Sequence, residues 1–109
     1  MGISEQIEKY LEEFHNCIKK EYEHREDYNK TQAELNVLMA RHIDKSSASF
    51  ENKIQLLMKN PDVQKRAEEL NNLYFASEVY FKKYRDLSEY WRLKVIELQS
   101  QRKHEGSGL

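Results

Sequence analysis

The fold is decided by one stretch, residues 60–104, which reads NPDVQKRAEELNNLYFASEVYFKKYRDLSEYWRLKVIELQSQRKH. Read from Val63 in alternating steps of four and three, it places twelve residues on one side of a helix, and nine of them are apolar or aromatic. We call these twelve the core row: Val63, Ala67, Leu70, Tyr74, Ser77, Phe81, Tyr84, Ser88, Trp91, Val95, Leu98 and Arg102. A heptad pattern of this length predicts a long helix that packs lengthwise against another helix.

A second apolar row lies beside the core row and consists of Leu73, Tyr80 and Leu87. It widens the apolar surface beyond what one neighbouring helix covers. The beginning of the helix is marked by Asn60, a capping residue, and by Pro61, which suits the first helical position. We therefore expect a helix over residues 61–104.

Another long helix is expected over residues 3–43. Its apolar positions follow the same heptad spacing, with Glu21, Arg25 and Gln32 interrupting them in the middle. These positions are Ile7, Leu11, Phe14, Ile18, Tyr28, Leu35 and Met39. Small polar residues at 44–49 favour a turn, and residues 50–59 carry apolar side chains at helical spacing, which predicts a short helix there.

These elements predict an all-α fold, a long antiparallel helical hairpin with a short crossover helix. We expect a single helical domain over residues 1–105 and a flexible tail at 106–109. The hairpin alone leaves apolar surface uncovered, which favours assembly into a homo-oligomeric helical bundle or ring. The residues expected at the oligomer interface are Leu70, Tyr74, Phe81, Tyr84, Leu87, Trp91, Val95 and Leu98.

The composition excludes several classes of protein. The apolar segments are far shorter than the roughly 20 residues that span a bilayer, and the N-terminus lacks the pattern of a secretory leader. Cys17 is the only cysteine, so an internal disulfide is impossible and a reducing compartment is favoured. We therefore expect a soluble, cytoplasmic protein.

No motif for catalysis or for cofactor binding stands out, and we expect neither an enzyme nor a bound cofactor. The one spacing typical of metal sites is Glu-x-x-His, which occurs as Glu12/His15 and as Glu21/His24. Nine residues separate the two pairs, which places them on opposite sides of one helix. They cannot share an ion within one chain, and solvated helical residues are the better interpretation.

Positive charge is concentrated near the C-terminus. Residues 82–103 hold seven basic and three acidic side chains, whereas residues 1–44 hold six basic and ten acidic ones. One face of the last helix, which we call the basic row, contains Lys82, Arg85, Glu89, Arg92, Ile96, Gln99 and Lys103.

Aromatic residues surround the basic row, and basic groups beside rings are what single-stranded nucleic acid binding requires. Two other interpretations stay open. The aromatic residues at core-row positions can form the core of the bundle, and the basic residues can pair with the acidic first helix.

The last helix also resembles the UvsY family of phage recombination mediators. The resemblance lies in Asp62-Val63, Leu70, Leu87-Ser88-Glu89, Trp91, Leu93-Lys94 and Ile96, with a further likeness at Ala40-Arg41 and Asp44. It implies a helical hairpin that forms a ring-like oligomer, binds single-stranded DNA, and helps a phage recombinase replace the single-strand-binding protein. It also adds Arg41 to the expected DNA contacts.

Two hypotheses follow. In the first, the chain is a non-enzymatic recombination mediator of phage type, acting in the host cytoplasm. Its expected phosphate contacts are Arg41, Lys82, Arg85, Arg92, Lys94 and Lys103. In the second, it is a helical adaptor, chaperone or small inhibitor that binds a partner through its aromatic surface, without nucleic acid.

Overall fold

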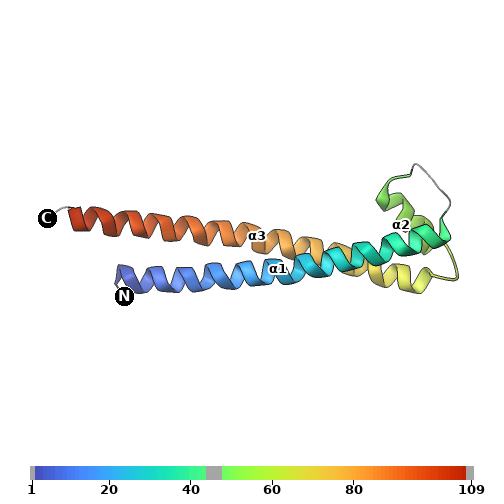
Figure 1. Cartoon of the computed structure of the whole chain (residues 1–109), viewed down its shortest axis with the longest axis horizontal. Helices are drawn as coiled ribbons and strands as arrows, with labels where there is room; N and C mark the ends of the chain where they lie inside the picture. The colour runs from blue at the N-terminus through green and yellow to red at the C-terminus, as the bar shows by residue number, and fades with distance from the viewer. Residues whose placement is uncertain (1, 44–47, 108–109) are drawn as a thin grey trace. The chain divides into compact units, whose positions relative to one another are not determined.

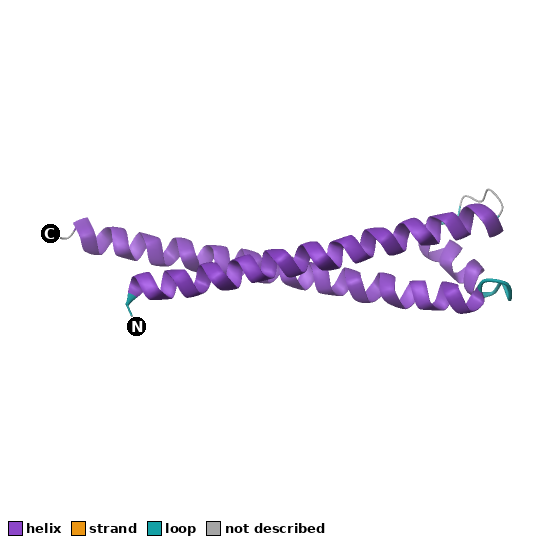
Figure 2. Ribbon diagram, turned by 60° about the horizontal axis from the view of Figure 1, so that its bottom comes forward, coloured by secondary structure: helices purple, strands orange, loops and turns teal. Residues whose placement is uncertain are grey.

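The computed structural model describes residues 2–43 and 48–107, and in these ranges the chain is an all-α helical hairpin. Helix α1 spans Ile3–His42, the short α2 spans Phe50–Met58, and α3 spans Gln64–Ser107 (Figure 1). Figure 2 shows helices and loops, and no strand, over the described residues. The predicted fold class is confirmed.

Helix α3 differs from its predicted bounds at both ends. Helix α3 begins at Gln64 and not at Pro61, because Asn60 forms a turn: its side-chain Oδ1 accepts the Asp62 N–H at 3.0 Å and its carbonyl accepts the Val63 N–H at 3.2 Å. At the other end α3 continues through Gly106 to Ser107. Most of the predicted turn at 44–49, and residues 108–109 of the predicted tail, lie outside the described ranges.

The chain divides into two compact units. Unit 1 comprises residues 1–23 and 80–109, and unit 2 comprises residues 24–79. In each unit a part of α1 packs against an antiparallel part of α3, and α2 belongs to unit 2 (Figure 1).

Unit 2 has the thicker core, because its three helices bury apolar side chains together. The core consists of Leu35, Met39, Ile54, Leu57, Ala67, Leu70 and Tyr74. Helix α2 supplies Ile54 and Leu57, and its first turn is capped by Ser49, whose Oγ accepts the Asn52 N–H. The predicted crossover helix therefore completes this core.

Unit 1 is a two-helix pair with a thinner core. Its buried side chains are Ile7 and Cys17 from α1 and Phe81, Ser88 and Val95 from α3. Tyr10 packs on Trp91, with ring centroids 5.2 Å apart.

The core row of α3 is confirmed as the inward face. Eleven of its members are buried or half-buried, and Arg102 is exposed. Two members are serines whose hydroxyls donate to carbonyls of α3: Ser77 Oγ bonds Leu73 O and Ser88 Oγ bonds Arg85 O, each at 2.7 Å. These bonds satisfy the buried hydroxyl groups, so the polar interruptions are compatible with the core.

The inward face of α1 differs from the prediction in its middle part. Cys17 is buried, whereas Ile18 is 43% exposed. Arg25 is likewise exposed, whereas His24 is half-buried. Thr31 is buried, and its hydroxyl donates a hydrogen bond to the Asp27 carbonyl at 2.7 Å. The helix is therefore rotated slightly from the orientation that apolarity alone predicts.

Candidate nucleic-acid interface and interhelical groove

The basic residues predicted to contact phosphate lie on the surface. Lys82, Arg85, Arg92 and Lys103 are exposed along α3, and Lys94 is half-buried. Arg85 and Arg92 are seven residues apart and share a face, while Lys94 follows Arg92 by two residues and lies on the opposite side of the helix. Arg41 is exposed in the last turn of α1 and belongs to unit 2.

Three of these cations form ion pairs with neighbours on α3. Arg85 Nε lies 3.4 Å from Asp86 Oδ1, and Lys94 Nζ lies 3.6 Å from Glu97 Oε2. Arg92 makes two bonds to Glu89, of which Nε to Oε2 measures 2.9 Å. For these residues the ion pairs that the structure shows lie within α3, and not with the acidic first helix.

Arg92 and Glu89 of the basic row form an ion pair with two hydrogen bonds. Its hydrogen bonds lower the pKa of the Glu89 carboxyl and raise the pKa of the Arg92 guanidinium. Both side chains are solvent-exposed, so water and salt weaken their attraction. A phosphate can therefore compete with the Glu89 carboxylate for the two parallel donors of Arg92.

The residues predicted to form an oligomer interface pack inside the single chain. In unit 2, Leu70 and Tyr74 are buried, and the Tyr74 ring stacks on Tyr28 at 4.6 Å. In unit 1, the remaining residues are buried or half-buried: Phe81, Tyr84, Leu87, Trp91, Val95 and Leu98. Their assignment to a subunit interface stays a prediction.

Other apolar side chains of α3 face solvent. In unit 1 these are Tyr80, Tyr90, Leu93 and Ile96, each between 46% and 53% exposed. From the second predicted row, Leu73 in unit 2 and Tyr80 in unit 1 are exposed, and Leu87 is half-buried. Tyr90, Leu93 and Ile96 follow one another at three-residue spacing and so lie close together, whereas Tyr80 lies ten residues before Tyr90. Large apolar side chains exposed close together on one helix are typical of an interaction surface.

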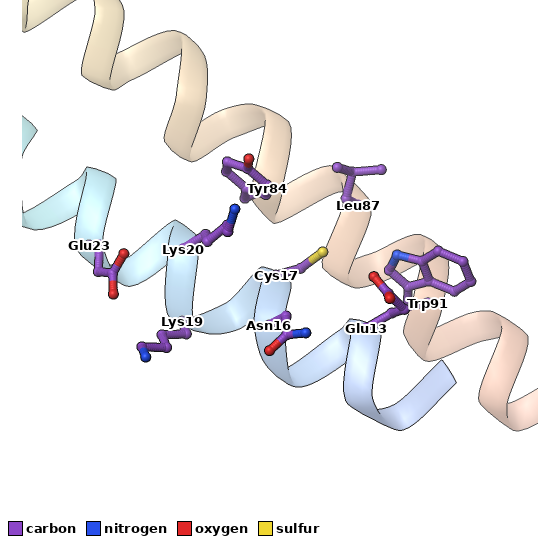
Figure 3. Close-up of a pocket in the computed structure, with 9 residues that line it drawn as sticks. All are labelled: Glu13, Asn16, Cys17, Lys19, Lys20, Glu23, Tyr84, Leu87 and Trp91. Carbon is purple, nitrogen blue, oxygen red and sulfur yellow. The ribbon is translucent and has the colours of Figure 1, made fainter. Parts of the chain in front are cut away.

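A groove of about 510 Å³ lies between α1 and α3 of unit 1. Helix α1 contributes polar side chains and the Cys17 thiol, and α3 contributes apolar and aromatic ones (Figure 3). The lining residues are Glu13, Asn16, Cys17, Lys19, Lys20, Glu23, Tyr84, Leu87 and Trp91. In Figure 3 the Cys17 side chain points toward α3, along which Tyr84, Leu87 and Trp91 follow one another.

Two ammonium groups lie near the Tyr84 ring at one end of this groove. Lys20 Nζ of α1 is 5.4 Å from the ring centroid, and Lys83 Nζ of α3 is 5.6 Å from it. Both distances are within the range of cation–π attraction. Lys20 lines the groove and Lys83 does not, so at this end the groove combines the Tyr84 ring with the positive charge of Lys20.

The chemistry of Cys17 is that of a packed thiol. Burial raises its pKa, the negative charge of Glu13 raises it further, and Lys20 lowers it. Because the thiolate is the reactive form, the raised pKa makes Cys17 a slow nucleophile at neutral pH. Among the described residues, no group of three or more His, Cys, Asp or Glu side chains is placed to hold a metal ion.

The groove could not be located from the sequence, because in the middle of α1 the inward positions were assigned to Ile18 and Arg25, one residue after Cys17 and His24. The signal that points to it is the heptad series through Tyr10, Cys17, His24 and Thr31, which lies beside the apolar series.

Over the residues that the structure describes, no helix is long and apolar enough to cross a membrane.

Comparisons of this chain with known proteins give no family: no family model matches it, and neither a curated protein nor a solved structure does. The function proposed for this chain therefore depends on the geometry of unit 1 and on the sequence resemblance of the last helix.

Proposed function

We propose that this protein binds single-stranded DNA as a non-enzymatic, self-associating helical protein and assists recombinase loading in the manner of a phage recombination mediator. The observation that carries the proposal is the exposure of Lys82, Arg85, Arg92 and Lys103 along α3. At about 1.5 Å per residue these cations span roughly 30 Å of helix. A row of that length can follow several phosphates of one strand.

Exposed rings on the same helix support the proposal. Tyr80 is 46% and Tyr90 is 50% exposed, so both are accessible for stacking, unlike the buried rings of Tyr74 and Phe81. Stacking on aromatic rings is tolerant of sequence, and the basic row supplies the attraction for the backbone. The resemblance to UvsY-type mediators supports the recombinase and single-strand-binding protein as partners, and the host cytoplasm as the place of action.

Fluorescence anisotropy with a labelled oligonucleotide tests the proposal. We expect binding that weakens with salt, and a loss of affinity of about tenfold or more at low salt in the double variant Arg85→Gln/Arg92→Gln. If each arginine contacts one phosphate, the slope of log K against log salt falls by about 1.4.

The matched control is Lys59→Gln/Lys65→Gln, which removes the same charge from exposed positions of unit 2. It should change affinity much less. Equal losses in the two double variants, or no binding of the unmodified protein at low salt, would contradict the proposal.

A second candidate function is a helical module that binds another protein. The observation that favours it is the group of exposed apolar side chains Tyr90, Leu93 and Ile96 on α3. Light scattering with and without an oligonucleotide separates the two candidates. A change in mass on adding DNA favours the mediator, whereas a mass unaffected by DNA favours the protein-binding module.

A further inference from the structure

The groove of unit 1 has the size of a small-ligand site and two chemically different walls. Its volume of about 510 Å³ falls within the range of 300–1,000 Å³ that is typical of such sites. The α3 wall presents the Trp91 indole, the Leu87 side chain and the Tyr84 ring (Figure 3). Rings and apolar groups arranged in this way suit a flat aromatic ligand.

Four charged side chains line the groove, Glu13, Lys19, Lys20 and Glu23. Of these, the Lys20 ammonium lies near the Tyr84 ring, together with Lys83, which lies outside the lining. Lys20 and Lys83 approach the Tyr84 ring from two different helices, at 5.4 and 5.6 Å. Glu13 lines the groove beside Trp91, as Figure 3 shows, and its carboxylate disfavours a second anion there. A fitting ligand therefore has its negative charge near Tyr84 and an uncharged part near Trp91.

A nucleotide of a single strand has this distribution of charge. Its base is flat and uncharged, and its phosphate is an anion that ammonium groups neutralise. The polar edge of a base can also meet Asn16 and Glu13, since amide and carboxylate side chains bind exocyclic amino groups.

We infer that the groove is a subsite for one base of single-stranded DNA, which lies against Trp91 and Leu87 while its phosphate is neutralised by Lys20 and Lys83. This inference rests on the proposed function and adds to it the place where a base is held. It also assigns DNA contacts to Lys20 of α1, a helix whose first part is acidic overall.

The chain carries two natural reporters of this site. Trp91 and Cys17 are its only tryptophan and its only cysteine, and both line the groove. Emission of Trp91 reports a base stacked on the indole. Alkylation of the buried Cys17 thiol by N-ethylmaleimide is slow in the free protein, and a further fall in its rate reports loss of access through the groove. Both can be followed in the full chain during titration with an oligonucleotide whose binding is measured independently by anisotropy.

Filling the groove should quench Trp91 emission and slow the alkylation of Cys17 with the same midpoint as the anisotropy change. At about ten times Kd roughly nine-tenths of the sites are occupied, so the alkylation rate should fall about tenfold. Inorganic polyphosphate, which has the charges but no bases, should leave Trp91 emission unchanged.

The variant Lys20→Gln should lower the salt slope by about 0.7 and weaken the quenching of Trp91. Its control is Lys9→Gln, an equal loss of charge at an exposed position of α1 outside the groove. Equal effects of these two variants would overturn the inference.

Three further outcomes would also overturn the inference that the groove holds a base. Binding seen by anisotropy without change at Trp91 or Cys17 would overturn the subsite and leave the proposed function intact. Protection of Cys17 that rises with protein concentration in the absence of DNA would assign the groove to a second copy of the chain. No binding by anisotropy would overturn both.

Discussion

At the scale of single residues, the pair Tyr28–Tyr74 combines packing with a polar contact. The rings stack at 4.6 Å, and the two hydroxyl oxygens are 2.7 Å apart in a hydrogen bond. Burial raises the pKa of Tyr74, and the bond to Tyr28 raises it further. The folded state therefore favours the neutral form of Tyr74, and this preference links the stability of unit 2 to pH.

The sign of this pH dependence follows from the raised pKa. Below pH 10, the ordinary value for tyrosine, Tyr74 is neutral in both states and its stabilising effect is complete. Above about pH 10 the unfolded chain loses the proton while the folded chain keeps it, so the free energy of unfolding falls. The variant Tyr74→Phe lacks this group and should be about 1 kcal/mol less stable at neutral pH, because it loses one hydrogen bond.

Urea denaturation of both proteins between pH 7 and 11 measures the effect. The two stability curves should converge as pH rises above 10, since only the wild-type chain loses the Tyr74 contribution. Lysines titrate in the same range, but they are common to both proteins and cancel in the difference. A difference in stability that stays constant over this range would contradict the prediction.

At the scale of elements, the helices were predictable and the rotation of α1 was not. Heptad spacing identifies two neighbouring rows on α1, one through Ile18 and Arg25 and one through Cys17 and His24. Apolarity favours Ile18 over Cys17 at the inward position. The side chains of a helix have fixed angular positions around its axis, however, so packing at one position also determines which residues face inward nearby. Packing of Tyr10 on Trp91 fixes an orientation in which Cys17 faces inward.

The Glu89–Arg92 pair of α3 leads to a prediction about DNA binding. If the basic row contacts phosphate, the Glu89 carboxylate competes for the donors of Arg92. Glu89→Gln removes this competition and one negative charge, so affinity should rise about threefold to tenfold at low salt and less at high salt. Anisotropy over a salt series measures it.

The control is Glu68→Gln, which changes the net charge by the same amount at an exposed position of unit 2. A similar gain in both variants would mean that net charge, and not release of Arg92, determines affinity. An unchanged affinity of Glu89→Gln would show that Arg92 does not contact phosphate.

At the scale of the whole molecule, the exposed apolar side chains of α3 predict self-association. Leu93 is 53% exposed, and Leu93→Glu should lower the molar mass seen by light scattering at micromolar concentration, because a charge at an apolar interface is unfavourable. Ser100→Glu is the matched control: it is exposed and lies seven residues later on the same face of α3. A monomeric wild-type protein, or equal effects of the two substitutions, would rule out this interface.

The hairpin and its core were predictable because the core row of α3 is nearly free of interruptions. Leu70 and Tyr74 lie in the core as the spacing requires. The groove was not predictable, because it depends on which row of α1 faces α3 and on the side-chain positions of Lys20 and Trp91. That Arg92 forms its ion pair with Glu89, and not with the first helix, could not be predicted either. The number of charges in each segment does not say which side chains lie within reach of one another.

The buried hydroxyl groups described above have a consequence for helix alignment. Each hydroxyl of Thr31, Ser77 and Ser88 has one proton, and it donates that proton to a carbonyl of its own helix. These residues therefore oppose lengthwise sliding of α1 past α3 only by their shape. In unit 2, the directional contacts of Tyr28 with Tyr74 and of Glu34 with Arg66 add to the apolar packing of the core and so help to fix the lengthwise alignment of the two helices.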